Sequence, residues 1–244
     1  HVDYPVEREG ADRYARCART LNEWVRSGIV SLDDSATFSL YRMVFTDESG
    51  RNRSTVGVIG ALEVVDEGAG GVLPHERTTP KAKTDRLDLT RATSCNLSPV
   101  WGLSLTAGLS DLLTEPAEVV ARVVDADGVE HTLERVTDPS RLAEISRAVS
   151  SNPVLIADGH HRYAISRTYR DEQRASGGPA TAELTMTYVA ELVAEQLSIA
   201  AIHRLVTGHG ADEVLARLAT FYDTRPAGRV GTGTILGMEE AGAL

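Results

Sequence analysis

The segment VLIADGHHRYAISRTYR, residues 154–170, decides the fold. Residues 154–157 are all apolar, which is typical of a short strand that is buried on both faces. An Asp-Gly turn follows, and from His160 the sequence favours a helix that reaches about Ala175 and ends at a Gly-Gly-Pro sequence. The segment therefore predicts a central strand, a tight turn and a helix.

Strands and helices alternate around this segment in the second half of the chain, whereas the first half is typical of hairpins. Strands are expected at 38–45, 55–65, 99–105, 118–124, 130–136 and 184–194, helices at 10–28, 83–92, 138–151 and 211–221, and a further element at 199–206. An α/β class (α+β mixed), with a mixed β-sheet and covering helices, fits both halves. No convincing linker divides the sequence, so we expect a single domain over residues 1–244.

Composition excludes several functional classes. The 244 residues carry a net charge of −10, which argues against general nucleic-acid binding and against anionic membranes. Cys17 and Cys95 stand far apart and outside any CxxC pattern, so a disulfide framework and a zinc ribbon are not expected, and a reduced, cytoplasmic protein is. No apolar run of membrane-spanning length and no signal peptide are present.

The DGHHR sequence combines features that favour an anion. A helix N-terminus exposes backbone N–H groups and roughly half a positive charge. Cations in the first helical turn are unfavourable for helix stability, so His160, His161 and Arg162 are expected to face an anionic ligand. The alternative interpretation is that Asp158 is a simple N-cap and that the histidines are surface or core residues.

A second charged segment is LPHERTTPKAKTDRL, residues 73–87. One irregular loop here supplies a candidate general base, cations and hydroxyl donors, and functional residues favour loops on rigid scaffolds. We expect this loop and the DGHHR turn to lie beside one cleft. The alternative is an ordinary solvated loop.

Metal and nucleotide motifs give little further guidance. His75, Glu76 and His203 suggest a metal together with the DGHHR histidines, but no HExxH or HxH spacing is present, so hydrolytic zinc remains an alternative only. A P-loop, a GxSxG elbow and a GxGxxG fingerprint within a βαβ unit are all absent. His203-Arg204 alone is also typical of a partly buried histidine at a strand end.

Three segments resemble the bacterial family catalogued as domain of unknown function 1015. They are LPHERTTPKAKTDRLDLTRATSCNLSPV, VLIADGHHRYAISRTY and IHRLV, in the family's order and spacing, and the resemblance runs from about His1 to Val206. The last motif reads AIHRLV where the family has PTHRLV, so only His203 and Arg204 carry over. Family members usually have a further N-terminal segment with an APPYDV-like motif, so this chain is expected to be a fragment.

The resemblance also carries an implication about activity. The DGHHR turn is similar to a turn in the ParB/sulfiredoxin-like group, which includes kinases that act on free serine and hold nucleotide or pyrophosphate oxygens at this place. The resemblance therefore implies a phosphotransferase for a small hydroxy compound such as free serine, with ATP, ADP or pyrophosphate as the phosphoryl donor. The partners expected are the small-molecule substrate and the phosphate donor.

Residue roles follow from the same resemblance and from the charges. The phosphate- and substrate-binding residues are expected to be Gly159, His160, Arg162, Lys81, Lys83, Arg86, His203 and Arg204. The catalytic residues are expected to be Glu76, Asp158, His75 and His161. Glu76 is the candidate base, with His75 orienting it, and Asp158 is the candidate Mg²⁺ ligand. The alternatives are a phosphatase or metal-assisted hydrolase, and a ParB-like nucleotide-binding regulatory module.

Overall fold

The computed structural model describes residues 2–3, 5, 12–47, 50–74, 80–197 and 207–223, without the side chains of 80–84 and 195. The chain divides into two compact units, residues 1–197 and 198–244. In the second unit the structure describes α6 (Ala211–Leu218). The single domain over 1–244 stays a prediction, because most of the second unit lies outside the described residues. Within the described ranges, no helix is both long enough and apolar enough to cross a membrane.

An eight-stranded mixed sheet organises the first unit, in the order β3-β7-β4-β8-β2-β1-β6-β5. The strands are β1 (Phe38–Thr46), β2 (Asn52–Glu63), β3 (Val72–Leu73), β4 (Val100–Ser104), β5 (Glu118–Val124), β6 (Glu130–Val136), β7 (Val154–Asp158) and β8 (Leu184–Glu191). The helices are α1 (Arg13–Arg26), α2 (Pro80–Thr93), α3 (Leu109–Thr114), α4 (Pro139–Ser150) and α5 (His160–Ser176), with 3₁₀ turns η2 (Ala180–Glu183) and η3 (Ala194–Gln196). The predicted mixed α/β class is confirmed.

Strand direction changes across the sheet. β3 pairs with β7 and β4 pairs with β8 in parallel, while the other neighbouring strands are antiparallel. The strands expected at 38–45 and 55–65 form the hairpin β1–β2, and those expected at 118–124 and 130–136 form the hairpin β5–β6. In the second hairpin Asp125 N donates a hydrogen bond to Val129 O, and Gly128 has φ 80°. The DADG sequence at 125–128 is typical of such a turn.

Several elements differ from the sequence expectation. α2 begins at Pro80 instead of 83, and β8 ends at Glu191 instead of 194. After β8 the chain forms the turn η3, where the Gln196 side chain accepts a hydrogen bond from Val56 N at 2.8 Å. Residues 56 and 196 are far apart in sequence, so no local pattern predicts this contact. β3 and α3 were not expected, because two and six residues are too short to show a period. The element expected at 199–206 lies outside the described residues.

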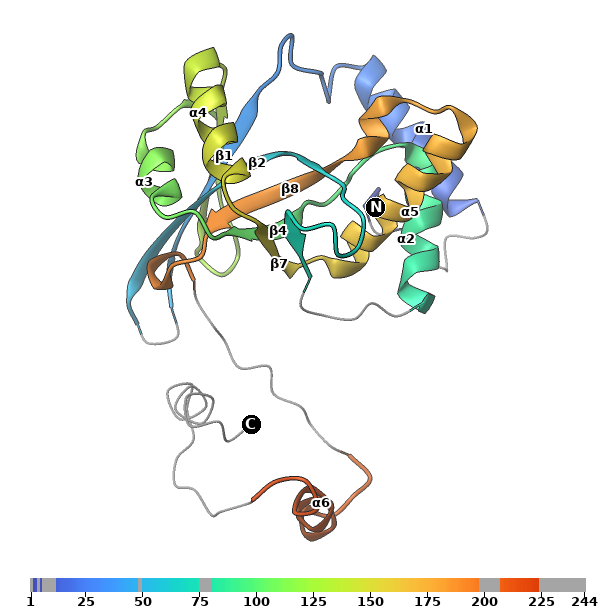
Figure 1. The fold of residues 1–244 in the computed structure, drawn as a ribbon, viewed down its shortest axis with the longest axis vertical. Helices are drawn as coiled ribbons and strands as arrows, with labels where there is room; N and C mark the ends of the chain where they lie inside the picture. Colours follow the sequence, from blue (N-terminus) through green and yellow to red (C-terminus); the bar gives the residue numbers. More distant parts are fainter. Residues whose placement is uncertain are drawn as a thin grey trace. The chain divides into compact units, whose positions relative to one another are not determined.

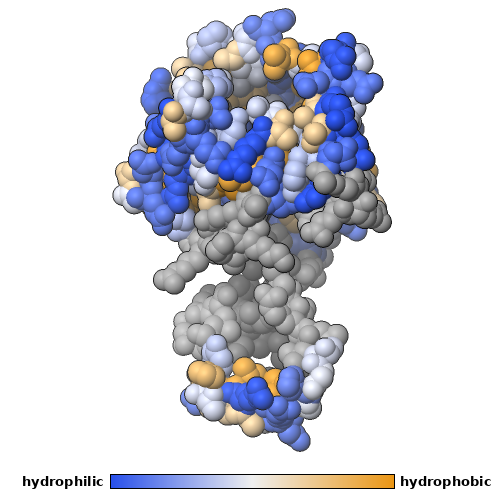
Figure 2. Space-filling model, turned by 90° about the vertical axis from the view of Figure 1, so that its right-hand side faces the viewer, coloured by the Kyte–Doolittle hydropathy of each residue, from blue (hydrophilic) through white to orange (hydrophobic). Residues whose placement is uncertain are grey.

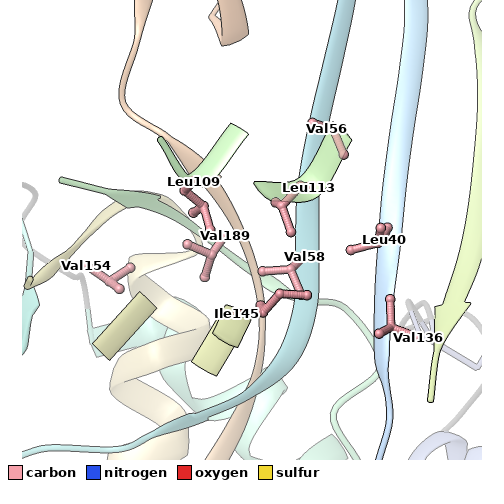
Figure 3. Close-up of a cluster of buried hydrophobic side chains, with 9 residues drawn as sticks. All are labelled: Leu40, Val56, Val58, Leu109, Leu113, Val136, Ile145, Val154 and Val189. Atoms are coloured by element: carbon pink, nitrogen blue, oxygen red, sulfur yellow. The ribbon is translucent and has the colours of Figure 1, made fainter. Parts of the chain in front are cut away.

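Two groups of helices pack on the same face of the sheet. Figure 1 shows α3 and α4 at one end and α1, α2 and α5 at the other. At the first end Leu113 and Ile145 pack with Val154 in the cluster drawn in Figure 3. At the other end Tyr163 of α5 packs with Ile156. Because Val154 and Ile156 are two residues apart on β7, both helix groups cover one face.

The opposite face of β7 is less enclosed than its apolar sequence predicts. Leu155 and Ala157 are half-buried, whereas Val154 and Ile156 are buried. The apolar cluster on this face is formed by strand residues and Leu197. The expectation of a strand fully buried on both faces is therefore wrong within the described part of the chain, although β7 does lie inside the sheet.

Helix α5 also holds the segment that follows β2. Arg170 is 2% exposed, and it donates to the carbonyl of Val64 and to the carboxylates of Asp66 and Asp171. The Tyr163 hydroxyl accepts a bond from Val65 N at 2.9 Å. Buried charge is tolerated only when it is paired, so these contacts fix the segment that leads to β3 against α5.

Candidate functional site

The predicted strand, turn and helix are confirmed at the DGHHR sequence. β7 ends at Asp158 and α5 begins at His160. Gly159 between them has φ 87°, in the left-handed region that favours glycine. A Cβ atom at Gly159 would also stand 3.0 Å from the guanidinium of Arg162. The turn conformation therefore favours glycine, and a larger residue would also displace the Arg162 side chain.

Arg162 folds back over the turn and is engaged within the protein. It donates to the Asp158 carboxylate and to the carbonyl of Pro99. These bonds use two of the five N–H donors of a guanidinium. They tie the start of α5 to the loop before β4, so Arg162 has a structural role whatever else it binds. His160 is buried and His161 is half-buried.

The sheet topology brings the two charged segments to one end of the sheet. β3 and β7 are parallel, with Leu73 opposite Leu155. The carboxyl ends of parallel strands meet at the same edge of a sheet. The loop after β3 and the turn after β7 therefore leave the sheet at the same end, and α2, which follows the loop, packs against α5 (Figure 1). His75 and Glu76 lie outside the described residues, so their position beside His161 stays a prediction.

A small pocket lies between α2 and α5 and brings together two residues of the predicted anion site. Its volume is about 40 Å³, and its lining includes Arg86 from α2 and Arg162 from α5. Leu89 and Ile165, each 3% exposed, give it an apolar floor. Charges that lie over an apolar floor are less well screened than charges in open water.

Sequence reasoning missed other residues that line this pocket. Asn96 accepts a bond from Thr185 Oγ1 at 3.1 Å, and Thr185 Oγ1 lies 2.9 Å from Ser166 Oγ. Ser98 and Cys95 complete this wall, and burial raises the pKa of the Cys95 thiol. The sequence feature that could have identified these residues is NLSP at 96–99, which belongs to the family motif quoted above but carries no charge.

The structure does not describe the side chains of the other four candidate binding residues, Lys81, Lys83, His203 and Arg204. Lys81 and Lys83 belong to α2, but their side chains lie outside the described residues. The whole of His203 and Arg204 lies outside them as well. In the described part of the chain, no three His, Cys, Asp or Glu side chains gather in a way that could hold a metal ion.

A second helix start in the same fold shows how an anion is held. α3 follows Gly108, which has φ 84°. The buried carboxylate of Glu191 accepts hydrogen bonds from Gly108 N at 2.9 Å and Ser110 N at 2.6 Å. Burial by itself raises the pKa of Glu191, but these backbone donors outweigh it and the pKa is lowered. The N-terminus of α3 therefore binds an anion that the protein supplies.

Fold and pocket together define a mixed α/β protein with an arginine-lined pocket beside a strand–glycine–helix turn. Comparison of sequences then gives the family: the chain belongs to the family described as protein of unknown function (DUF1015), whose model matches residues 1–241. No curated protein and no solved structure matches the chain.

Proposed function

We propose that the protein binds a phosphoryl donor at the start of α5 and transfers its phosphoryl group to a small hydroxy compound such as free serine. The observation that carries the proposal is the pocket that Arg86 and Arg162 line together from two separate helices. Guanidinium groups pair with phosphate oxygens bidentately, and a helix N-terminus adds backbone donors. Two arginines at such a place favour a phosphate-bearing ligand.

The contrast with α3 supports the same proposal. The first turn of α3 contains Asp111 and receives Glu191, in agreement with the helix dipole. The first turn of α5 contains no acidic residue and carries two histidines and an arginine. A helix start of this composition is suited to an anion from outside the chain.

The proposed chemistry distributes roles over the two segments. ATP, ADP or pyrophosphate would place its phosphates at the first turn of α5, where Mg²⁺, when bound, would neutralise charge on the phosphate oxygens. The Asp158 carboxylate is 68% exposed and has one oxygen bonded to Arg162, so it fits the single carboxylate ligand that Mg²⁺ accepts beside phosphates. Glu76 would remove the hydroxyl proton, with His75 orienting it. The resemblance of the turn's sequence to the ParB/sulfiredoxin-like group favours this proposal, and a protein that uses such donors would act in the cytoplasm.

Phosphorus NMR tests the proposal directly. ATP, ADP and pyrophosphate are each incubated with L-serine and a panel of amino acids and polyols, with and without Mg²⁺. We expect a new phosphomonoester signal that requires protein, donor and acceptor together. Phosphate release without an acceptor would indicate a hydrolase, and donor affinity without turnover would indicate a nucleotide-binding regulatory module.

A matched pair of variants ties the signal to the site. Arg162→Ala removes the pocket arginine, while Arg174→Ala removes an arginine from the last turn of the same helix, where it pairs with Glu183 at the surface. We expect product formation to fall in the first variant and to persist in the second. Equal activity of the two variants would contradict the proposed site.

A further inference from the structure

Asp3 lines the arginine-lined pocket and bonds to two of its other lining residues. Its carboxylate accepts hydrogen bonds from Arg86 Nη1 at 3.1 Å and from Ser98 Oγ at 2.7 Å, and its main-chain carbonyl accepts another from Arg86. Arg162 lines the same pocket. The carboxylate therefore lies where two guanidinium groups and a hydroxyl gather, which is a donor set that recognises oxyanions.

We propose that Asp3 is an internal ligand of an oxyanion site, and that it must leave before the carboxylate or phosphate group of an external ligand binds. The inference rests on the proposed function, because it concerns the same pocket. With Asp3 in place, the free volume of about 40 Å³ holds a few water molecules at most. An external oxyanion therefore competes with Asp3 for Arg86 and Ser98.

The exposure of the contact makes Asp3 displaceable. The side chain of Asp3 is 49% exposed and that of Arg86 is 27% exposed. Ion pairs that reach solvent are screened by salt and contribute little free energy. The donors belong to α2, which packs against α1 and α5, and to the loop before β4, which pairs with β8. An external anion can therefore exchange with the Asp3 carboxylate from the solvent side of the pocket.

Calorimetric titration measures this competition. Pyrophosphate and glycolate, a simple hydroxycarboxylate, are titrated separately into wild type, Asp3→Asn and Asp34→Asn. Asp34 is exposed and lies outside the pocket, so its substitution makes the same change in net charge without vacating the site. We expect Asp3→Asn to bind the anion about two- to fivefold more tightly, the range expected for removal of an exposed ion pair, and Asp34→Asn to match wild type.

A double-mutant cycle separates competition at Arg86 from a general charge effect. In an Arg86→Ala background, Asp3→Asn should bring a smaller gain in affinity, because the charged shared donor is absent and only Ser98 remains shared. Unchanged or weaker binding by Asp3→Asn would overturn the internal ligand and leave the proposed function standing. Tighter binding of glycolate without any binding of pyrophosphate would support the internal ligand and contradict the phosphoryl donor. If neither pyrophosphate nor glycolate binds wild type or Asp3→Asn, both proposals fail.

Discussion

Helices α3 and α5 both begin after a glycine in the left-handed conformation, but different residues surround their first turns. Each follows a glycine with positive φ, 84° at Gly108 and 87° at Gly159. At α3 the buried carboxylate of Glu191 binds the first backbone donors. At α5 the first turn carries two histidines and an arginine, and Asp3 lines the nearby pocket at its exposed edge. One local geometry thus serves stability at α3 and, in our proposal, ligand binding at α5.

The two ends of the sheet also differ in the kinds of side chain that they bring together. The α3 end packs Leu109, Leu113 and Ile145, all 0% exposed, in one apolar cluster (Figure 3). The α5 end gathers arginines, hydroxyls and an amide around a small pocket. On the face of the molecule shown in Figure 2, hydrophilic residues predominate and hydrophobic residues are scattered among them. Substitutions at the two ends should therefore affect different measurements.

The largest expected effect is a loss of kcat on substitution of the proposed base, Glu76. Glu76→Gln should lower kcat by about 10²–10⁴-fold with KM little changed, because a base acts mainly in the transition state. The measurement is steady-state kinetics with the donor and acceptor that the phosphorus assay identifies. Glu67→Gln is the control, because Glu67 is exposed and forms a surface ion pair with Arg167. An unchanged kcat in Glu76→Gln would move the role to Asp158.

The next effect concerns anion affinity at α5. Arg162→Ala should weaken pyrophosphate binding by about 10- to 150-fold, which corresponds to a charge-assisted contact of about 1.5–3 kcal/mol. Arg162→Lys should recover only part of the loss, because an ammonium group cannot form the bidentate contact. The bonds to Pro99 and Asp158 also predict a lower melting temperature for Arg162→Ala. A lower melting temperature with unchanged affinity would leave Arg162 with a structural role only.

At α3 the same kind of substitution should affect stability instead. Glu191→Gln should lower the free energy of unfolding at neutral pH by about 1.5–3 kcal/mol, because it removes a charged acceptor of two backbone donors. Since the folded pKa of Glu191 is lowered, its stabilisation is present above the unfolded value of about 4.3 and is lost as the pH falls through the folded value.

Urea denaturation of wild type and Glu191→Gln at neutral and acid pH measures this difference. The gap between the two proteins should narrow once the pH falls below about 4. Glu118→Gln, on the exposed strand β5, serves as the control. A gap that stays constant with pH would show that the carboxylate charge is not the stabilising feature.

The smallest effect is expected at Asp111, in the first turn of α3. Asp111→Asn should reduce stability by about 0.3–1 kcal/mol, the usual contribution of an acidic residue near a helix N-terminus. The reduction should shrink at high salt, because exposed charges are screened. Urea midpoints at low and high ionic strength measure it. A loss that does not depend on salt would point to a contact other than the dipole.

The sequence predicts most of the regular elements, including a helix that starts near His160. Periodicity and turn chemistry are local, so they find hairpins, long helices and the strand–glycine–helix turn. They cannot find β3, which consists of two residues and exists through its pairing with β7. They also cannot find the carboxylate at α3, because Glu191 belongs to a distant strand. The same limit explains why Arg86 was expected at the site while Ser98, which is uncharged, was not.

The buried contacts of Arg170 have a mechanical consequence. Arg170 and Tyr163 of α5 form hydrogen bonds with residues 64–66, and β3 begins six residues after this segment. Because helices transmit displacement along their axis and packed interiors deform little, a movement of α5 would be passed to this segment and then to the strand that precedes Glu76. Binding at the first turn of α5 would then also displace the segment that leads to β3.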